Sequence, residues 1–346
     1  MRAVLCPAAL PADDPGSLVD AELERPAPGA TDLLVRVRAV SVNPIDTKMR
    51  MMSSPHARGG PAKPRVLGWD AAGEVLAAGA QVRGFEVGDR VFYAGSIGRP
   101  GSNSEFHCVD HRLVGHMPAQ WSFAQAAALP LTALTAWEAL FERLYLGALP
   151  FQARSPRPAP VVLIVGGAGG VGSMAIQLAR QVPDATVLAT ASRPSSAAWC
   201  RELGAHHVLD HDLSLPDRVR EVAPAGVDAV LLTRDPDHYL PLLAPTLAVF
   251  GQVCSIVEAA APLPVAALRA SSAGFAWEGM FTRGGRRPAD MGRQGQILDT
   301  VAAWCETGRL RGTLTEDFGV LNAANLRAAH QRVESGSMIG KGVLTL

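Results

Sequence analysis

The chain has 346 residues, of which 48% are hydrophobic and 18% are charged, and its formal net charge at pH 7 is zero. This composition excludes a disordered chain and provides no basic surface for nucleic acid or for an anionic membrane. The length favours two domains, and small molecules or further copies of the chain are the expected partners.

The N-terminus and the cysteines indicate a cytoplasmic protein. The first apolar run is too short for a signal peptide, and no stretch reaches the ~18 apolar residues of a membrane span. The cysteines are scattered, odd in number and never in a C-x-x-C pair: Cys6, Cys108, Cys200, Cys254 and Cys305. We therefore expect free thiols in a reducing compartment, without a disulfide or zinc framework.

The first third of the chain predicts short strands. Residues 33–42, LLVRVRAVSV, alternate apolar and charged side chains with the period of a half-buried strand. Two further apolar runs, AAGEVLAAG and GDRVFYAG, contain the glycines typical of turns between strands. We expect a β-rich domain here, without a long helix before about Phe123.

From Ser122 onwards the apolar spacing becomes helical. Residues 122–144 predict one helix with Ser122 as its N-cap, and a proline-rich loop follows over residues 147–160. Helices then alternate with the apolar runs VVLIV, TVLATA, HHVLD, VDAVLLT and VFGQVCSIV. This pattern predicts a parallel sheet covered on both faces, a doubly wound α/β domain. The tail from Gly295 predicts two helices and a final strand.

A glycine-rich loop joins VVLIV to the next helix. Gly167, Gly169 and Gly172 have G-x-G-x-x-G spacing, and the helix carries one apolar stripe. We expect Gly167 to permit a tight turn, Gly169 to let the backbone approach a pyrophosphate, and Gly172 to allow close helix–strand packing. The helix N-terminus, with Gly170 and Val171, would offer N–H groups to the phosphates. A merely structural turn is the alternative.

The end of the second strand indicates which dinucleotide is bound. A site for NADH would have Asp or Glu about 20 residues after the loop, whereas this strand ends in Ser192 and Arg193. A carboxylate would repel a 2′-phosphate, but a guanidinium and a hydroxyl can bond it. NADPH is therefore predicted, with a solvated loop arginine as the alternative. His211, at the end of the third strand, is either a further contact or a surface histidine.

Eight motifs together resemble one family: SVNPIDTKMR, VLGWDAAGEV, YAGSIGRPGSNSEF, AAALPLTALTAWE, GGAGGVG, ELGAHHVLDH, WEGMFTR and ESGSMIGKGVLTL. Along essentially its whole length the chain resembles the medium-chain dehydrogenase/reductase superfamily. Within it, the chain is similar to the zinc-free quinone oxidoreductase branch and to bacterial "zinc-type alcohol dehydrogenase-like" proteins. The resemblance implies a GroES-like catalytic domain (1–125), a Rossmann NADP-binding domain (126–282) and a C-terminal return to the catalytic domain (283–346). It also implies a homodimer through the Rossmann sheet edge near residues 275–277.

The same resemblance implies that the metal ligands are missing. The first Cys of the zinc-dependent relatives corresponds to Asn43, and their His–Glu turn corresponds to Trp69 and Asp70. Their further Cys falls in AALPLTAL, which contains no thiol. Catalytic zinc needs thiolate or imidazole ligands, so no zinc is expected. The rival metal candidates would lie too far apart on a strand, about 13 Å from the first histidine to the second: His107, Cys108, His111 and His116.

The resemblance also assigns roles in catalysis. It places Asn43 beside the nicotinamide, where its amide could hydrogen-bond a substrate carbonyl; a pre-proline turn residue is the alternative. Asp46 is either an orienting or a structural residue. Thr135 matches the threonine that approaches the nicotinamide, unless it only bonds its own helix backbone. Lys341, in the closing GKGVLTL, is taken as a cofactor contact.

These features favour one reaction class. Where some relatives carry a tyrosine as a proton donor, DTKMRMM offers Lys48, so no general acid is evident. Hydride transfer to a quinone or an activated alkene can use water as the proton source, whereas a plain ketone needs a polarising group. Trp277 and Phe281 either wall an apolar substrate pocket or belong to the core of the last sheet strand.

We therefore expect a zinc-independent, NADPH-dependent reductase of quinones or α,β-unsaturated carbonyls. A zinc-type alcohol dehydrogenase is the alternative within enzymes. A non-catalytic NADPH-binding sensor or structural protein is the alternative outside them.

Overall fold

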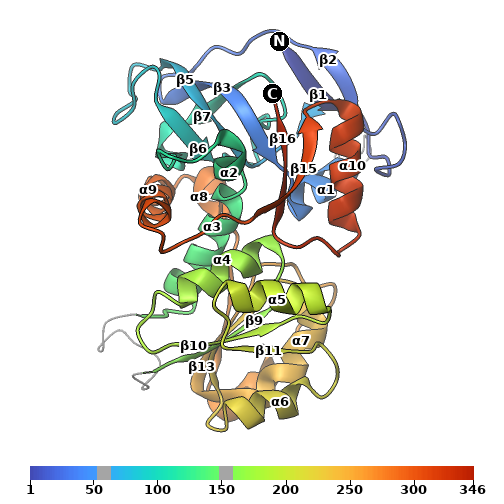
Figure 1. The fold of residues 1–346 in the computed structure, drawn as a ribbon, viewed down its shortest axis with the longest axis vertical. Coiled ribbons are helices and arrows are strands. Elements are labelled where there is room, and N and C mark those ends of the chain that lie inside the picture. Colours follow the sequence, from blue (N-terminus) through green and yellow to red (C-terminus); the bar gives the residue numbers. More distant parts are fainter. Residues whose placement is uncertain (53–63, 148–158) are drawn as a thin grey trace. The chain divides into compact units, whose positions relative to one another are not determined.

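The computed structural model describes residues 1–52, 64–147 and 159–346 (Figure 1). The chain divides into two compact units: unit 1 is Met1–Leu131 with Phe281–Leu346, and unit 2 is Thr132–Met280. Most of the expected proline-rich loop lies outside the described residues. Within the described ranges, none of the helices has the length and apolar character needed to cross a membrane.

Unit 1 is built on two sheets, and its strands confirm the β-rich domain. The smaller sheet has the order β2 (Val19–Glu22), β1 (Arg2–Cys6), β4 (Arg65–Val66). The larger sheet has the order β15 (Leu314–Val320), β16 (Lys341–Thr345), β3 (Asp32–Ser41), β5 (Ala71–Ala78), β6 (Arg90–Tyr93), β8 (Val114–His116), and β7 (Phe106–Asp110) also pairs with β3. On β3, Val35 and Val37 are buried while Arg36 and Arg38 are exposed, as the alternation predicts.

A short helix that the sequence analysis did not predict, α1, spans Pro44–Met51. Its start is specified by local chemistry rather than by apolar period. Asn43 is the N-cap, Pro44 occupies the first helical position, and Asp46 accepts the Asn43 backbone N–H at 2.6 Å. Later helices of unit 1 are α2 (Phe123–Ala127), α8 (Phe281–Arg286), α9 (Arg293–Glu306) and α10 (Ala323–Glu334). In Figure 1, α10 lies beside α1 and β15.

The prediction of one continuous helix over residues 122–144 is wrong. The segment forms α2, then α3 (Pro130–Trp137), then a π-helix η2 (Glu138–Arg143). Pro130 explains the break, because proline lacks an N–H and disfavours helical backbone in the residue before it. The predicted cap is confirmed: Ser122 Oγ accepts the Gln125 N–H at 3.2 Å, and Gln125 Oε1 accepts the Ser122 N–H at 2.9 Å.

Unit 2 confirms the doubly wound domain. Its six parallel strands have the order β11 (His207–Leu209), β10 (Thr186–Thr190), β9 (Val161–Val165), β12 (Val227–Leu232), β13 (Leu247–Ser255), β14 (Gly274–Trp277). Figure 1 shows α4 (Gly170–Ala179) and α5 (Pro194–Glu202) on one side of the sheet and α6 (Leu215–Val222) and α7 (Pro236–Leu243) on the other. The strand order reverses between β9 and β12, which is where such sheets bind ligands at their carboxyl edge.

The tail confirms its two predicted helices and final strand as α9, α10 and β16. It also contains β15, which the sequence did not predict. β15 pairs in parallel with β16, and their pairing shifts in register at two points. The β15 sequence, LTEDFGV, contains no run of apolar residues, and its residues are at most partly buried. Its sequence therefore does not predict a buried strand.

Candidate functional site

The glycine loop between β9 and α4 lies at the carboxyl edge of the parallel sheet. Gly166 has the left-handed φ of +82°, so the tight turn also depends on this glycine, one residue before the predicted Gly167. Gly167 lies in the same turn and allows close packing. A Cβ added there would lie 2.8 Å from Ala189 Cβ and 2.9 Å from Cys200 Sγ.

The next two glycines shape the entrance to α4. A Cβ on Gly172 would lie only 2.2 Å from the Gly166 carbonyl oxygen, as the expected close helix–strand packing requires. A Cβ on Gly169 would have no neighbour nearer than 3.7 Å, so that side of the loop is open. No side chain caps α4, and its first N–H groups, at Gly170 and Val171, have no partner within the helix. An open cradle with converging N–H groups fits a dinucleotide pyrophosphate.

The end of β10 fixes the loop and presents an arginine beside it. Thr190, which the sequence analysis did not single out, accepts the Gly166 N–H on its hydroxyl at 2.9 Å and the Gly167 N–H on its carbonyl at 3.1 Å. Ser192 and Arg193 follow and are exposed. The Arg193 Nε–H donates to Ser196 Oγ at 3.2 Å, at the start of α5. A guanidinium therefore stands at the strand end where a site for NADH has a carboxylate.

Two other predicted residues lie elsewhere in unit 2. His211 follows β11, the strand next to β10, and its Nδ1 pairs with the Tyr239 hydroxyl at 2.9 Å. Burial lowers the pKa of His211, with a smaller effect from the positive charge of Arg234. The imidazole is thus held against α7. Thr135 lies on α3 and is 5% exposed.

Unit 1 brings Asn43, Asp70 and Lys341 together in one buried polar cluster, from the start of α1, the start of β5 and β16. The Lys341 ammonium donates to Asn43 Oδ1 at 2.5 Å and to the Val42 carbonyl at 2.9 Å, and lies 3.1 Å from Asp70 Oδ2. Asn43 Nδ2 donates to Asp70 Oδ2 at 2.9 Å. Asp70 Oδ1 accepts the Leu131 N–H at 2.8 Å, in the first turn of α3.

Burial and neighbouring charges explain the shifted pKa values of Asp70 and Asp46. Burial raises the pKa of Asp70, while the charge of Lys341 and the Asn43 amide oppose that rise. Burial also raises the pKa of Asp46, to about 7, against its bond from the Asn43 N–H and the charge of Lys341. An ammonium has three donors, and those of Lys341 face three acceptors in this cluster. Its assignment as a cofactor contact therefore gives way to a role beside Asn43.

The residues at the metal-ligand positions do not fit a zinc ion. Trp69 is 1% exposed, its indole has only an N–H donor, and that N–H bonds the Ser96 carbonyl at 3.3 Å. Asn43 and Asp70 use their polar atoms on each other and on Lys341, whose positive charge would repel a cation at this place. Among residues 1–52, 64–147 and 159–346, no three His, Cys, Asp or Glu side chains are grouped to hold a metal.

The three histidines among the rival metal candidates each contact different residues. His107 bonds Tyr93 and Pro100, His111 bonds Thr31, and His116 stacks on Phe85. Burial raises the pKa of Cys108 to about 11, so this thiol stays protonated at neutral pH. These side chains hold strands and loops of unit 1 in place.

Trp277 and Phe281, interpreted above as either pocket or core residues, lie in different elements. Trp277 is on the edge strand β14 and is 49% exposed, so its reading as a core residue is wrong. Phe281 is in α8, not in the last strand, and packs edge-on against Trp69 with ring centroids 6.1 Å apart. Phe281 therefore packs against the indole that stands at a metal-ligand position.

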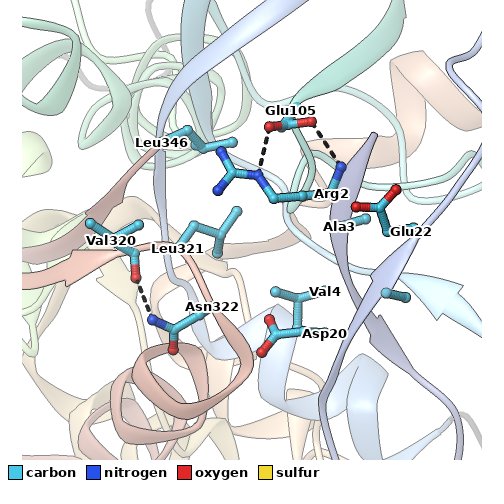
Figure 2. A pocket seen from close by; sticks show the side chains of 11 residues that line it. Arg2, Ala3, Val4, Asp20, Glu22, Glu105, Val320, Leu321, Asn322 and Leu346 are labelled. Atoms are coloured by element: carbon cyan, nitrogen blue, oxygen red, sulfur yellow. Dashed lines mark hydrogen bonds and ion pairs between the residues drawn. The ribbon is translucent and has the colours of Figure 1, made fainter.

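A cavity of about 530 Å³ lies in unit 1, away from the polar cluster. Figure 2 shows it lined by residues of β1, β2, the connection from β15 to α10, and the C-terminal Leu346. Its charged lining is mainly acidic, and its one arginine, Arg2, is paired with Glu105 at 2.7 Å. This cavity is unsuited to the phosphates of a dinucleotide.

Unit 2 also buries two carboxyl groups together. Glu138 starts η2 and is 1% exposed, and Glu278 follows β14 and is 4% exposed. Arg143 Nε lies 3.0 Å from Glu278 Oε2. Burial, and next the charge of Glu138, raise the pKa of Glu278, while Arg143 opposes this rise. The sequence analysis missed this pair because its members are far apart in the chain.

Comparisons with known proteins agree with this fold. Residues 29–136 match the alcohol dehydrogenase GroES-like domain and residues 203–344 match the zinc-binding dehydrogenase family. A zinc-type alcohol dehydrogenase-like protein of Staphylococcus aureus (strain MSSA476) is 38% identical over 94% of each chain. A crystal structure from Rhizobium etli CFN 42, described as a candidate zinc-dependent alcohol dehydrogenase, is 45% identical over 100% of this chain and 98% of that chain, with a TM-score of 0.93. A quinone oxidoreductase from Pseudomonas syringae is 25% identical over 100% and 99%, with a TM-score of 0.80.

Proposed function

Because the chain belongs to the medium-chain dehydrogenase/reductase superfamily, we propose that it is a zinc-independent, NADPH-dependent reductase of quinones or α,β-unsaturated carbonyls. The observation that carries the proposal is the replacement of a metal-ligand set by Trp69 and the Asn43–Asp70–Lys341 cluster. Without a metal in that place, an acceptor that needs no strong polarisation of its carbonyl is the better substrate.

Residues of unit 2 would hold the cofactor. The N–H groups of Gly170 and Val171 would bind the pyrophosphate, and Ser192 and Arg193 would bind the 2′-phosphate. When bound, NADPH would supply a hydride. His211 and Thr135 stay secondary contacts in this proposal.

The acceptor determines where the electron pair moves after hydride transfer and which atom takes the proton. An enone that gains a hydride at its β-carbon moves an electron pair to its carbonyl oxygen, and the enolate then takes a proton from water at the α-carbon. A quinone similarly becomes a hydroquinone by gaining one hydride and one proton. Neither acceptor requires a dedicated general acid, because water can supply the proton.

We include a homodimer and a cytoplasmic location in the proposal. β14 is the edge strand of its sheet, and the exposed Trp277 packs edge-on against Phe275 with ring centroids 4.9 Å apart. An apolar edge of this kind favours pairing with a second copy of the chain. The five cysteines all lie in the part of the chain that the structure describes and form no disulfide there, which is compatible with a reducing compartment.

We expect NADPH oxidation with quinones and enones, little with simple ketones, and no loss of activity in a chelator. The measurement is absorbance at the NADPH band across such a panel, together with the zinc content of the protein. Strong inhibition by the chelator with rescue by zinc would instead identify a zinc-type alcohol dehydrogenase. Tight NADPH binding without turnover of any acceptor would favour a sensor or structural protein.

We expect NADPH to bind more than about tenfold more tightly than NADH, since a charged contact to the 2′-phosphate contributes about 1.5–3 kcal/mol. Arg193→Glu should narrow or reverse this preference, because a carboxylate repels that phosphate. Titration of both cofactors by fluorescence or calorimetry measures it. Arg201→Glu, at an exposed position in the last turn of α5, is the matched charge control. An unchanged ratio in Arg193→Glu would remove this residue from the site.

A further inference from the structure

The side-chain amide of Asn43 lies between a buried cation and a buried anion. Its Oδ1 accepts from the Lys341 ammonium at 2.5 Å, and its Nδ2 donates to Asp70 Oδ2 at 2.9 Å. An ammonium only donates and a carboxylate only accepts, so the reversed amide would face like against like at both ends. The two charged residues therefore fix which way the amide points.

One N–H of this amide is held only weakly. Nδ2 also donates to the Trp69 carbonyl, but at 3.4 Å, which is longer than the usual 2.9–3.0 Å of such bonds. A better acceptor at this position could take over that hydrogen. The other polar contacts of the amide are short and charge-assisted, so they would persist.

The charges themselves are held rigidly. Lys341 is 3% exposed and also donates to the Val42 carbonyl, and Asp70 is 0% exposed and also accepts the Leu131 N–H. A cation on the oxygen of an amide draws electron density from its nitrogen, so the remaining N–H becomes a stronger donor. The cluster thus combines a fixed orientation with polarisation.

We propose that Lys341 and Asp70 are positioning residues, which orient and polarise Asn43 so that its second N–H binds the carbonyl oxygen of the acceptor. This inference rests on the proposed function, because it requires a quinone or an enone as substrate. The buried ammonium then acts through the amide, at the place where a metal would act directly on the oxygen. Lys341 itself touches neither substrate nor cofactor.

The first test is Lys341→Met. We expect kcat for a quinone and an enone to fall about 10²-fold, as when one donor to a developing oxyanion is lost. The NADPH dissociation constant and the substrate KM should stay within about threefold. Because Lys341→Met leaves Asp70 without its counter-ion, the double variant Asp70→Asn with Lys341→Met provides a neutral version of the cluster, with the same expected loss in kcat.

The control is Ser41→Ala. It removes another buried bond to β16, from Ser41 Oγ to the Gly342 carbonyl at 2.8 Å, but leaves the Asn43 amide untouched. We expect lower stability with unchanged kcat. An equal loss of kcat in Ser41→Ala and Lys341→Met would reduce Lys341 to a structural role and overturn the inference. So would a rise in the NADPH dissociation constant with kcat unchanged.

A second readout does not depend on turnover. The chain has four asparagines, at 43, 103, 322 and 325, so selective ¹⁵N-asparagine labelling gives a simple side-chain amide spectrum. Lys341→Met should shift the Asn43 side-chain resonances and leave the other three in place, and an unmoved Asn43 signal would refute the orientation. If the wild-type protein binds NADPH but reduces no acceptor, the proposed function fails, and this spectrum still decides whether Lys341 orients the amide.

Discussion

Gly172→Ala is expected to abolish NADPH binding and to destabilise unit 2. The added Cβ would lie 2.2 Å from the Gly166 carbonyl oxygen and 2.7 Å from the Gly167 Cα. Both are backbone atoms of the turn between β9 and α4, so no side chain can rotate away. The cost in unfolding free energy should reach the upper end of the about 1–3 kcal/mol of overpacked sites. Thermal unfolding and cofactor titration of the full chain measure the two effects.

Two further substitutions, one in the same loop and one in α8 of unit 1, separate folding from binding. Gly169→Ala places its Cβ no nearer than 3.7 Å to other atoms, so it should fold normally yet bind NADPH more weakly, because the methyl enters the open side of the loop. Gly285→Ala, in α8 where a Cβ meets nothing within 4 Å, should leave NADPH binding unchanged and should not lower stability. Normal stability and normal NADPH affinity in Gly172→Ala would contradict the close helix–strand approach.

Glu278→Gln is expected to remove a large part of the loss of stability at alkaline pH. The pKa of Glu278 is raised in the folded protein, so the folded state keeps a proton that the unfolded chain releases above the ordinary carboxyl pKa. The unfolded state then binds fewer protons, and the free energy of unfolding falls as pH rises from the ordinary carboxyl pKa to the raised pKa of Glu278, about 9. A glutamine carries no titratable proton and avoids this fall.

The measurement is urea unfolding of the full chain from about pH 6 to about pH 9, comparing the wild type with the variant. The advantage of Glu278→Gln should grow with pH, because ionised Glu278 faces the charges of Glu138 and Glu142 and has the Arg143 guanidinium beside it. Glu221→Gln, an exposed carboxylate on α6, is the control and should give a pH-independent difference. A constant difference for Glu278→Gln as well would show that the pair holds no extra proton.

The sequence alone determined features that depend on neighbouring residues. The alternation on β3, the cap at Ser122 and the spacing of Gly169 and Gly172 all act over a few positions, so their outcome could be read from local pattern. The same reasoning should have found α1, since Asn43, Pro44 and Asp46 form a helix-start signal; it failed because only apolar period was considered.

Only the tertiary structure decided which distant residues share a site. The fixed turn at Gly166 depends on how β9 meets β10, through the Thr190 hydroxyl. Lys341 and Asn43 are 298 residues apart and meet because β16 pairs with β3. No periodic pattern of residues around Lys341 could predict that it contacts Asn43. Burial makes such a charge costly unless it is paired, so the fold rather than the local sequence specified the Asn43–Asp70–Lys341 cluster.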